Sequence, residues 1–273
     1  MKTLKKSVRE WYKNIIFNLS AKNSWLIKLF YTRFYQPKKG SLSSFYHSYS
    51  LESPHIFVIQ VGANDGINHD PIHKFIKRDG WSGILIEPQP YVFRNKLHPL
   101  YRRNQNIALE NIAISQENCL MDMYRLSFTN ERWATGLTTF DKEVLQKRVD
   151  SGGVDFTAQK QGVKTPEKRE DYIENFKVEA KSFDFLIEKY QTKKVDVLQI
   201  DAEGFDFELV KLFDLSKRQP DVVVFEADHI SEQDFEEVES YLNSHSYVFK
   251  KVGRDVLAVN KSATIANKVF KAF

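Results

Sequence analysis

The sequence predicts an α/β protein with a mostly parallel sheet, a reversed strand at the sheet edge and a helical appendage at the N-terminus. Strand-like apolar runs alternate along the chain with stretches of helical periodicity. The runs 195–201 and 221–226 are almost continuously apolar, which is typical of parallel strands that helices cover on both faces. A short turn at 253–255 joins the last two runs and predicts an antiparallel pair. The expected strands are 56–61, 83–87, 107–114, 195–201, 221–226, 246–251 and 255–260.

Residues 1–40 form a basic appendage. They contain ten Lys or Arg and one acid, Glu10, whereas the whole chain has a net charge of +4, so the remainder is mildly acidic. This asymmetry argues against nucleic-acid binding by the main domain. Within the appendage, apolar residues recur at the spacing of one helix face, namely Leu4, Val8, Trp11, Tyr12, Ile15, Ile16 and Leu19.

Besides contact with nucleic acid, two interpretations of this apolar stripe stay open. In the first, it packs on the main domain or on a second copy of the chain, which allows a homo-oligomer. In the second, residues 1–35 lie on an anionic membrane surface, since a basic helix containing Trp suits the interface.

Breaks in the pattern suggest where the chain divides. Pro37, Gly40 and the serine-rich stretch 41–44 predict a linker before the main domain. Residues 127–180 interrupt the alternation of strand and helix, and we expect them to form an insertion on the substrate side. The predicted divisions are an appendage at 1–40, a linker at 41–54, a main domain at 55–262 and a C-terminal tail at 263–273.

Several classes of protein are disfavoured. The lone cysteine, Cys119, excludes an intramolecular disulfide and a cysteine-rich zinc site, and its apolar neighbours predict a buried thiol. No run of 18 apolar residues is present, and the basic start lacks the apolar region of a signal peptide. These features predict a cytoplasmic protein, with peripheral membrane association as the alternative.

The stretch 57–66, FVIQVGANDG, runs from a strand into a glycine turn. Gly62 and Gly66 lack the side chains that keep a ligand from the backbone, and a following helix would direct free N–H groups toward it. Glu87 ends the next apolar run, where a carboxylate can bind both hydroxyls of an adenosine ribose. The pair predicts a nucleoside cofactor, with ordinary strand-end turns as the alternative.

Spacing within the turn separates two cofactors. A dinucleotide turn is normally G-x-G-x-x-G, whereas this one has Asn64 and Asp65 between its glycines. A carboxylate at Asp65 would repel pyrophosphate but tolerates a sulfonium and an amino group. Tyr190 and Lys194 match the Tyr-x-x-x-Lys of short-chain dehydrogenases, but Lys177 stands where those enzymes place a serine. The spacing therefore favours S-adenosyl-L-methionine and methyl transfer over nicotinamide chemistry.

Acidic residues follow two predicted core strands. Asp201 and Glu203 end one, and Glu226 and Asp228 end the next. They can bind the cofactor's amino group and activate an acceptor hydroxyl, or Asp201, Glu226 and Asp228 can hold a divalent cation. His229 is a candidate general base because an ordinary histidine pKa is about 6.5, and Asp201 and Glu203 complete the expected catalytic set. Solvated helix caps and a structural histidine are the alternatives.

In these residues the chain resembles the FkbM-type S-adenosylmethionine-dependent methyltransferases. The likeness extends over about 55–260 and rests on the order and spacing of several blocks together. The blocks are IQVGANDG at 59–66, Asp70-Pro71 followed by GWSGILIEPQP at 80–90, LQIDAEGFD at 198–206, and VFE at 224–226.

The resemblance implies a Rossmann-like methyltransferase fold with a seven-stranded sheet. It also implies O-methylation of a hydroxyl on a saccharide, glycan or related metabolite. The turn from Gly62 to Gly66, with Asn64, would hold the methionine part, and Glu87 the ribose. Gln60 stands where such enzymes often carry an acid; a glutamine can accept a hydrogen bond but brings no charge.

For the remaining cofactor contacts, the resemblance places Ala113 and Ile114 beside the adenine and Asp201 on the sulfonium side. The expected partner is a small-molecule or glycan acceptor. Two other classes of function stay open: a nicotinamide-dependent sugar oxidoreductase, and a non-catalytic, membrane-associated scaffold that retains the fold.

Overall fold

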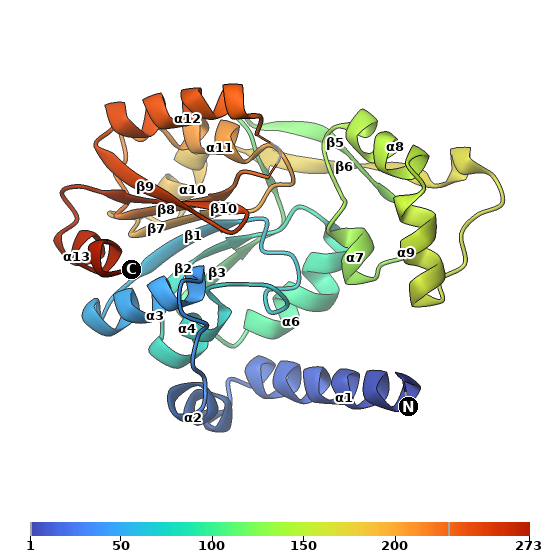
Figure 1. Cartoon of the computed structure of the whole chain (residues 1–273), viewed down its shortest axis with the longest axis horizontal. Helices are drawn as coiled ribbons and strands as arrows, with labels where there is room; N and C mark the ends of the chain where they lie inside the picture. Colours follow the sequence, from blue (N-terminus) through green and yellow to red (C-terminus); the bar gives the residue numbers. More distant parts are fainter. Residues whose placement is uncertain (1, 229) are drawn as a thin grey trace.

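A seven-stranded sheet forms the centre of the computed structural model, which describes residues 2–228 and 230–273 (Figure 1). Its order is β3-β2-β1-β7-β8-β10-β9. Neighbours from β3 to β8 are parallel, and β10 is antiparallel to both of its neighbours. The strands are β1 (Phe57–Val61), β2 (Ser82–Ile86), β3 (Ile107–Glu110), β7 (Val197–Ile200), β8 (Val222–Glu226), β9 (Tyr247–Val252) and β10 (Asp255–Asn260). The predicted α/β class is confirmed, and the reversed strand lies one place inside the edge, with β9 outside it.

Helices cover both faces of this sheet, because successive strand residues point to opposite sides. In β1, Val58 belongs to one buried cluster and Ile59 to the other. Figure 1 shows one set of helices above the sheet and another below it. The first set is α10 (Phe183–Lys189), α11 (Asp206–Phe213) and α12 (Glu232–Ser244); the second is α3 (Leu42–Glu52), α4 (His73–Asp79), α6 (His98–Tyr101) and α13 (Thr264–Ala272). The chain enters α6 through α5 (Pro90–Val92) and a π-helical turn, η1 (Phe93–Leu97).

The strand order reverses beside β1, whose two neighbours are β2 and β7. Connections from these strands leave in opposite directions, so a crevice opens at their carboxyl ends. Open α/β sheets bind ligands at this point. The turns after β1, β2, β7 and β8 therefore define where a site can form.

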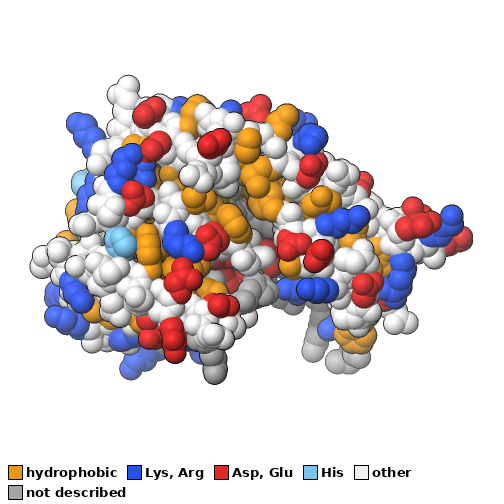
Figure 2. All heavy atoms as spheres, turned by 90° about the horizontal axis from the view of Figure 1, so that it is seen from above, with side chains coloured by type: hydrophobic (Ala, Val, Ile, Leu, Met, Phe, Trp, Pro, Cys, Tyr) orange, Lys and Arg blue, Asp and Glu red, His pale blue; other side chains and the backbone are white. Residues whose placement is uncertain are grey.

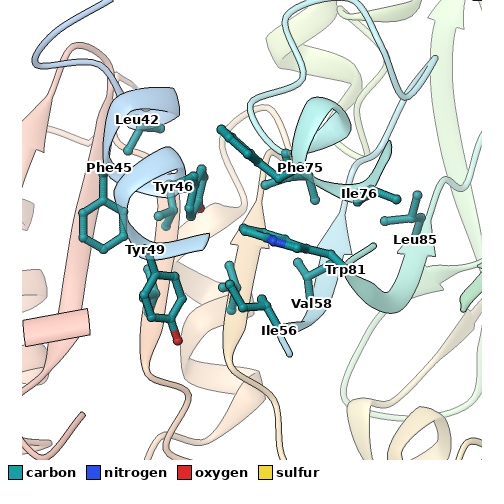
Figure 3. Close-up of a cluster of buried hydrophobic side chains, with 14 of the residues drawn as sticks. Leu42, Phe45, Tyr46, Tyr49, Ile56, Val58, Phe75, Ile76, Trp81 and Leu85 are labelled. Atoms are coloured by element: carbon teal, nitrogen blue, oxygen red, sulfur yellow. The ribbon is translucent and has the colours of Figure 1, made fainter. Parts of the chain in front are cut away.

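The predicted linker at 41–54 is wrong, because α3 occupies it. Ser41 accepts a hydrogen bond from the N–H of Ser44 and so caps the helix, which explains why a serine-rich stretch begins one. Phe45, Tyr46 and Tyr49 are fully buried in the main core (Figure 3). The predicted tail is likewise a helix, α13, that packs against α3 and β10.

A second sheet, in the order β4-β6-β5, leads into a smaller lobe. The expected strand at 107–114 is divided, since β3 ends at Glu110 and β4 (Ala113–Ile114) joins this second sheet. Buried residues of the lobe form their own small core around Leu145 and Tyr172. The other elements are β5 (Cys119–Leu126), α7 (Arg132–Thr135), α8 (Lys142–Asp150), α9 (Gly153–Gln161), the 3-10 turn η2 (Arg169–Asp171) and β6 (Ile173–Lys181). Cys119 is exposed at the start of β5, so the expectation of a buried thiol is wrong.

The appendage consists of α1 (Lys2–Ala21) and α2 (Trp25–Arg33), which lie beneath the main domain in Figure 1. Helix α1 packs against α6, and α2 packs against α4. Ile27 and Tyr31, one turn apart, are the buried face of α2. Among the described helices, none has the length and apolar character needed to cross a membrane.

Candidate active site

The turn after β1 touches the turn after β7. Gly62 has a φ of +78°, and a Cβ placed on it would lie 1.8 Å from the carbonyl oxygen of Asp201. A side chain cannot fit there, so glycine is required by both the backbone conformation and the close approach. The structure thus brings together two of the predicted site residues.

Glu87 braces the same turn from the end of β2. Its side chain is buried; Oε2 accepts the N–H of Asn64 at 2.8 Å and Oε1 accepts the N–H of Gln89 at 2.8 Å. Burial raises the pKa of Glu87 to about 7, although these N–H groups and the nearby Arg132 act in the opposite direction. Each carboxylate oxygen can accept more than one hydrogen bond, so the predicted contact with a ribose stays chemically open.

Two buried amide oxygens at the turn have no hydrogen-bond partner in the described part of the chain. They are Oε1 of Gln60 and Oδ1 of Asn64. The other end of the Gln60 amide donates to Asp70 at 3.1 Å, which fixes the side chain. Buried acceptors without donors cost free energy, and an ammonium group would supply the missing donors. The turn therefore fits the amino-acid end of S-adenosylmethionine.

The carboxylate of Asp65 forms hydrogen bonds within its own turn. Oδ1 accepts the N–H groups of Ile67 and Asn68 at 3.1 and 2.8 Å, and Oδ2 accepts the Asn68 side-chain amide. This pattern is a local turn cap. Asp65 nevertheless lines the cleft described below, so contact with a cofactor stays a prediction.

Gly66 serves packing. A Cβ on it would lie 2.7 Å from Leu97 and 2.8 Å from Tyr101. The helix expected directly after the turn begins later, at His73, and Asp70 already accepts the N–H of that residue at 2.8 Å. The expectation that this helix offers free N–H groups to the ligand is therefore wrong.

Ala113 and Ile114 lie in β4, with 2% and 4% of their surfaces exposed. Ala113 packs in the second sheet with Met123 and Val178, and Ile114 joins a core face of the main sheet. Neither residue borders the cleft, so their predicted contact with adenine stays a prediction.

A cleft of about 2850 Å³ lies between the main domain, the lobe and the two N-terminal helices, and Figure 2 shows this hollow with acidic side chains beside it. Asp201, Glu203 and Asp228 line it. Burial, followed by the charges of Asp201 and Glu226, raises the pKa of Glu203 to about 7. A carboxylate at the cleft wall with a pKa near neutrality can accept a proton from a hydroxyl.

Asp206 supports the loop that carries Glu203. It is buried and accepts the N–H groups of Ala202 and Gly204, each at 3.0 Å. Burial raises the pKa of Asp206 to about 7, against the effect of these two hydrogen bonds. Asp206 is therefore a loop cap at the start of α11.

Arg254 faces the acids at the end of β8. Its Nη1 lies 2.7 Å from Oε1 of Glu226, and its Nε lies 3.7 Å from Oδ2 of Asp228. Among the described residues, no group of three or more His, Cys, Asp or Glu is arranged to hold a metal ion. Binding of a divalent cation by Asp201, Glu226 and Asp228 thus stays a prediction, and the described residues do not form a ready-made metal site.

His229, the predicted general base, lies outside the described residues. Asp255, which no motif in the sequence marks, reaches the same region because β10 pairs it with Glu226. Burial and the charges of Asp201 and Glu226 raise the pKa of Asp255 to about 6, and Arg254 opposes them. The turn predicted at 253–255 marks where β10 begins, but no signal in the sequence shows that β10 pairs with β8, which is what places Asp255 here.

Gln89 is not among the predicted site residues, and it fastens the lobe to the main domain. Its Nε2 donates to the carbonyl of Thr135 and its Oε1 accepts the hydroxyl of Thr138, each at 2.9 Å. These contacts hold α7 against the end of β2, which places Arg132 near both Glu87 and Glu203. Gln89 lies within the GWSGILIEPQP block, whereas nothing in the sequence distinguishes Arg132.

Tyr190 and Lys194 are engaged away from the cleft. The Tyr190 hydroxyl hydrogen-bonds to Glu110. Lys194 pairs with Asp196 at 2.7 Å and with Asp221 at 3.0 Å, at the amino ends of β7 and β8. The Tyr-x-x-x-Lys pattern therefore does not form a dehydrogenase pair at the predicted cofactor site.

The central sheet has seven mostly parallel strands, one of which is reversed. At the point where the strand order reverses, a buried acid supports the glycine turn after β1. Together these features define a Rossmann-like methyltransferase fold. Residues 60–249 match the family model described as the methyltransferase FkbM domain. The chain belongs to the FkbM methyltransferase family, and the resemblance found in the sequence is confirmed. No curated protein matched the chain.

Solved structures similar to the chain are distant. One is the FkbM methyltransferase from Methylobacillus flagellatus, with 14% identity, a TM-score of 0.46, and coverage of 80% of this chain and 48% of that one. Another is precorrin-6y C5,15-methyltransferase from Geobacter metallireducens, with 11% identity, a TM-score of 0.36, and coverage of 84% and 92%. A third is a putative RNA methyltransferase from Pyrococcus horikoshii, with 11% identity, a TM-score of 0.38, and coverage of 87% and 96%. The chain thus spans about half the length of the Methylobacillus protein.

Proposed function

We propose that the chain is an S-adenosylmethionine-dependent O-methyltransferase that acts on a hydroxyl of a saccharide, a glycan or a related metabolite. The observation that carries this proposal is the contact between the turns after β1 and β7. It sets the predicted cofactor turn, at Gly62, against the loop that carries Asp201 and Glu203 on the cleft wall.

Residues on the β1 and β2 side would hold the cofactor. The oxygens of Gln60 and Asn64 would accept from the amino group, and Glu87 would accept from the ribose hydroxyls. When bound, S-adenosylmethionine would supply a methyl carbon for attack by a nucleophilic oxygen, with the thioether sulfur as the leaving group. The protein's contribution is then to orient the acceptor oxygen and remove its proton.

Glu203 is the base that the geometry supports best. It lines the cleft, and its raised pKa lets the carboxylate take the hydroxyl proton near neutral pH. Glu203 would take the proton of the hydroxyl whose oxygen bonds to the methyl carbon. Asp201 and His229 are the other candidates for this step.

Support for a saccharide acceptor comes from the chemistry of the cleft. Phe128 and Trp133 line it from the lobe, with ring centroids 6.5 Å apart, while the opposite wall carries Asp201, Glu203 and Asp228. Aromatic faces stack on the apolar faces of sugar rings, and carboxylates accept hydrogen bonds from sugar hydroxyls. Both features therefore suit a polyhydroxylated acceptor.

The test is transfer of a labelled methyl group from S-adenosylmethionine to a panel of glycans and nucleotide sugars. We expect the label in a product that survives mild alkali, because a methyl ether resists it whereas a carboxyl methyl ester is hydrolysed. Alkali-labile label, or label on nitrogen, would overturn the O-methyl proposal. A Glu203→Gln variant serves as the control for background transfer.

A further inference from the structure

The two N-terminal helices are fixed to the main domain by their inner faces. On α1, Ser20 is fully buried and lies 3.3 Å from Nε2 of His73. The other ring nitrogen of His73 lies 2.8 Å from the hydroxyl of Tyr101, which donates to the carbonyl of Gly66. On α2, Ile27 and Tyr31 are buried. These contacts determine which sides of the helices face outward.

The outward sides carry apolar residues, contrary to the usual placement. In α2, Trp25 and Leu29 lie about half a helix turn away from the buried Ile27 and Tyr31. Of the thirteen large hydrophobic residues exposed in the described chain, six lie within residues 11–34. These six define the outer face: Trp11, Tyr12, Trp25, Leu26, Leu29 and Phe34.

Within residues 11–51, which carry the outer face, the charged side chains have one sign. Residues 11–51 contain no Asp or Glu. Five cationic side chains of this stretch form no ion pair with the residues that the structure describes. They are Lys22, Lys28, Arg33, Lys38 and Lys39.

We propose that the outer face docks on an anionic membrane surface. Trp, Tyr and Phe favour the boundary between lipid headgroups and acyl chains, and nearby Lys and Arg gain from anionic headgroups. A second copy of the chain would bring two positive faces together, and a nucleic acid would leave the apolar side chains uncovered. A lipid surface matches both properties at once.

Docking in this way would also orient the cleft. Tyr12 and Phe34 belong to the outer face and line the cleft as well. Membrane contact would therefore hold one border of the cleft at the lipid surface.

Flotation of the full chain with vesicles tests the proposal. One set of vesicles is phosphatidylcholine alone, and the other contains phosphatidylcholine with a third of phosphatidylserine. We expect binding to the anionic vesicles, weakened by salt, and little binding to the neutral ones. Reversing two charges, in Lys28→Glu/Arg33→Glu, should lower partitioning about tenfold or more.

Two further variants separate membrane docking from a general loss of surface residues. Trp25→Ser/Leu29→Ser removes apolar contact from the outer face and should also lower partitioning at least about fivefold. Phe156→Ser/Lys168→Glu makes one change of each kind at exposed positions of the lobe and should leave partitioning unchanged. Circular dichroism checks that each variant is folded.

Three results would overturn the proposal. They are absence of binding to anionic vesicles, equal loss of binding in the lobe control, and a dimer in light scattering that Trp25→Ser/Leu29→Ser dissociates. The last result would assign the outer face to a second copy. Flotation does not depend on methyl transfer, so it can fail or succeed independently of the proposed reaction.

Discussion

Glu87 accepts a hydrogen bond from the backbone N–H of Asn64 at 2.8 Å, which joins the carboxyl end of β2 to the turn after β1. Asn64 is held with a φ of +46°, a conformation that few residues other than glycine adopt. From the sequence alone, the expected role of the Glu87 carboxylate is to bind the ribose of the cofactor. The structure adds that it shapes the turn that would hold the cofactor.

Replacement of Glu87 by Ala should weaken binding of S-adenosylhomocysteine by about tenfold or more, because the ribose contact and the support of Asn64 are lost together. Titration calorimetry measures this. The matched control is Asp221→Asn, which changes a carboxylate at the amino end of β8 that bonds Tyr49. Equal affinity in the Glu87 variant and the wild type would remove Glu87 from the cofactor site.

Two glycines with nearly the same φ allow the cost of backbone strain to be measured separately from the cost of a steric clash. Gly62→Ala, at +78°, meets the Asp201 carbonyl, whereas Gly80→Ala, at +76°, meets nothing within 4 Å. Gly80→Ala should lower the free energy of unfolding by about 1–2 kcal/mol, the cost of the left-handed conformation alone. Gly62→Ala should cost clearly more and abolish S-adenosylhomocysteine binding. Similar denaturation curves for both variants would contradict the contact.

Most of the fold could be predicted from the sequence because the period of apolar residues reports strands and helices directly. The segment 41–54 could not, since its serines favour a loop until Phe45, Tyr46 and Tyr49 find the core beneath them. The division of 107–114 into two strands could not be predicted either, because one apolar run contributes β3 to the central sheet and β4 to the second sheet. Both failures come from tertiary contacts that override local composition.

Glu203 should govern the pH dependence of turnover. With its pKa raised to about 7, the carboxylate becomes a base only as pH rises, so kcat should increase through pH 7. Glu203→Gln should lose most of kcat with S-adenosylhomocysteine affinity retained. An unchanged kcat and an unchanged pH profile would transfer the role to another residue.

The same pKa has a consequence for stability. A carboxyl whose pKa is higher in the folded state binds its proton more tightly there, so its contribution to the free energy of unfolding falls as pH rises from about 4.5 to 7. Urea denaturation of Glu203→Gln should show a shallower fall over this range, by on the order of 2 kcal/mol. A parallel pH dependence in wild type and variant would contradict the raised pKa.

Gln89 should control how firmly the lobe is held. Gln89→Leu leaves the hydroxyl of the buried Thr138 without its acceptor, at a cost of about 1–3 kcal/mol. We expect faster limited proteolysis within 127–172 and a higher KM for the acceptor. Gln146→Leu, at a partly exposed position of the same lobe that bonds Asp150, is the control. If both variants are cleaved at the wild-type rate, Gln89 does not fasten the lobe.

The candidate site was only partly accessible from the sequence. Strand ends marked Gly62, Glu87, Asp201 and Glu203, because parallel strands bring their carboxyl ends to one edge. Arg132 was not accessible, since its place depends on how the lobe packs on Gln89. A side chain that reaches the site from a distant part of the chain has no fixed sequence spacing to the other site residues, so no motif reveals it.

The most direct test is calorimetric titration of the wild-type chain with S-adenosylhomocysteine and, separately, with NAD. We expect one S-adenosylhomocysteine bound per chain and no heat of binding from NAD. Binding of NAD, or the absence of S-adenosylhomocysteine binding by folded protein, would contradict a methyl-donor site at the turn between Gly62 and Gly66.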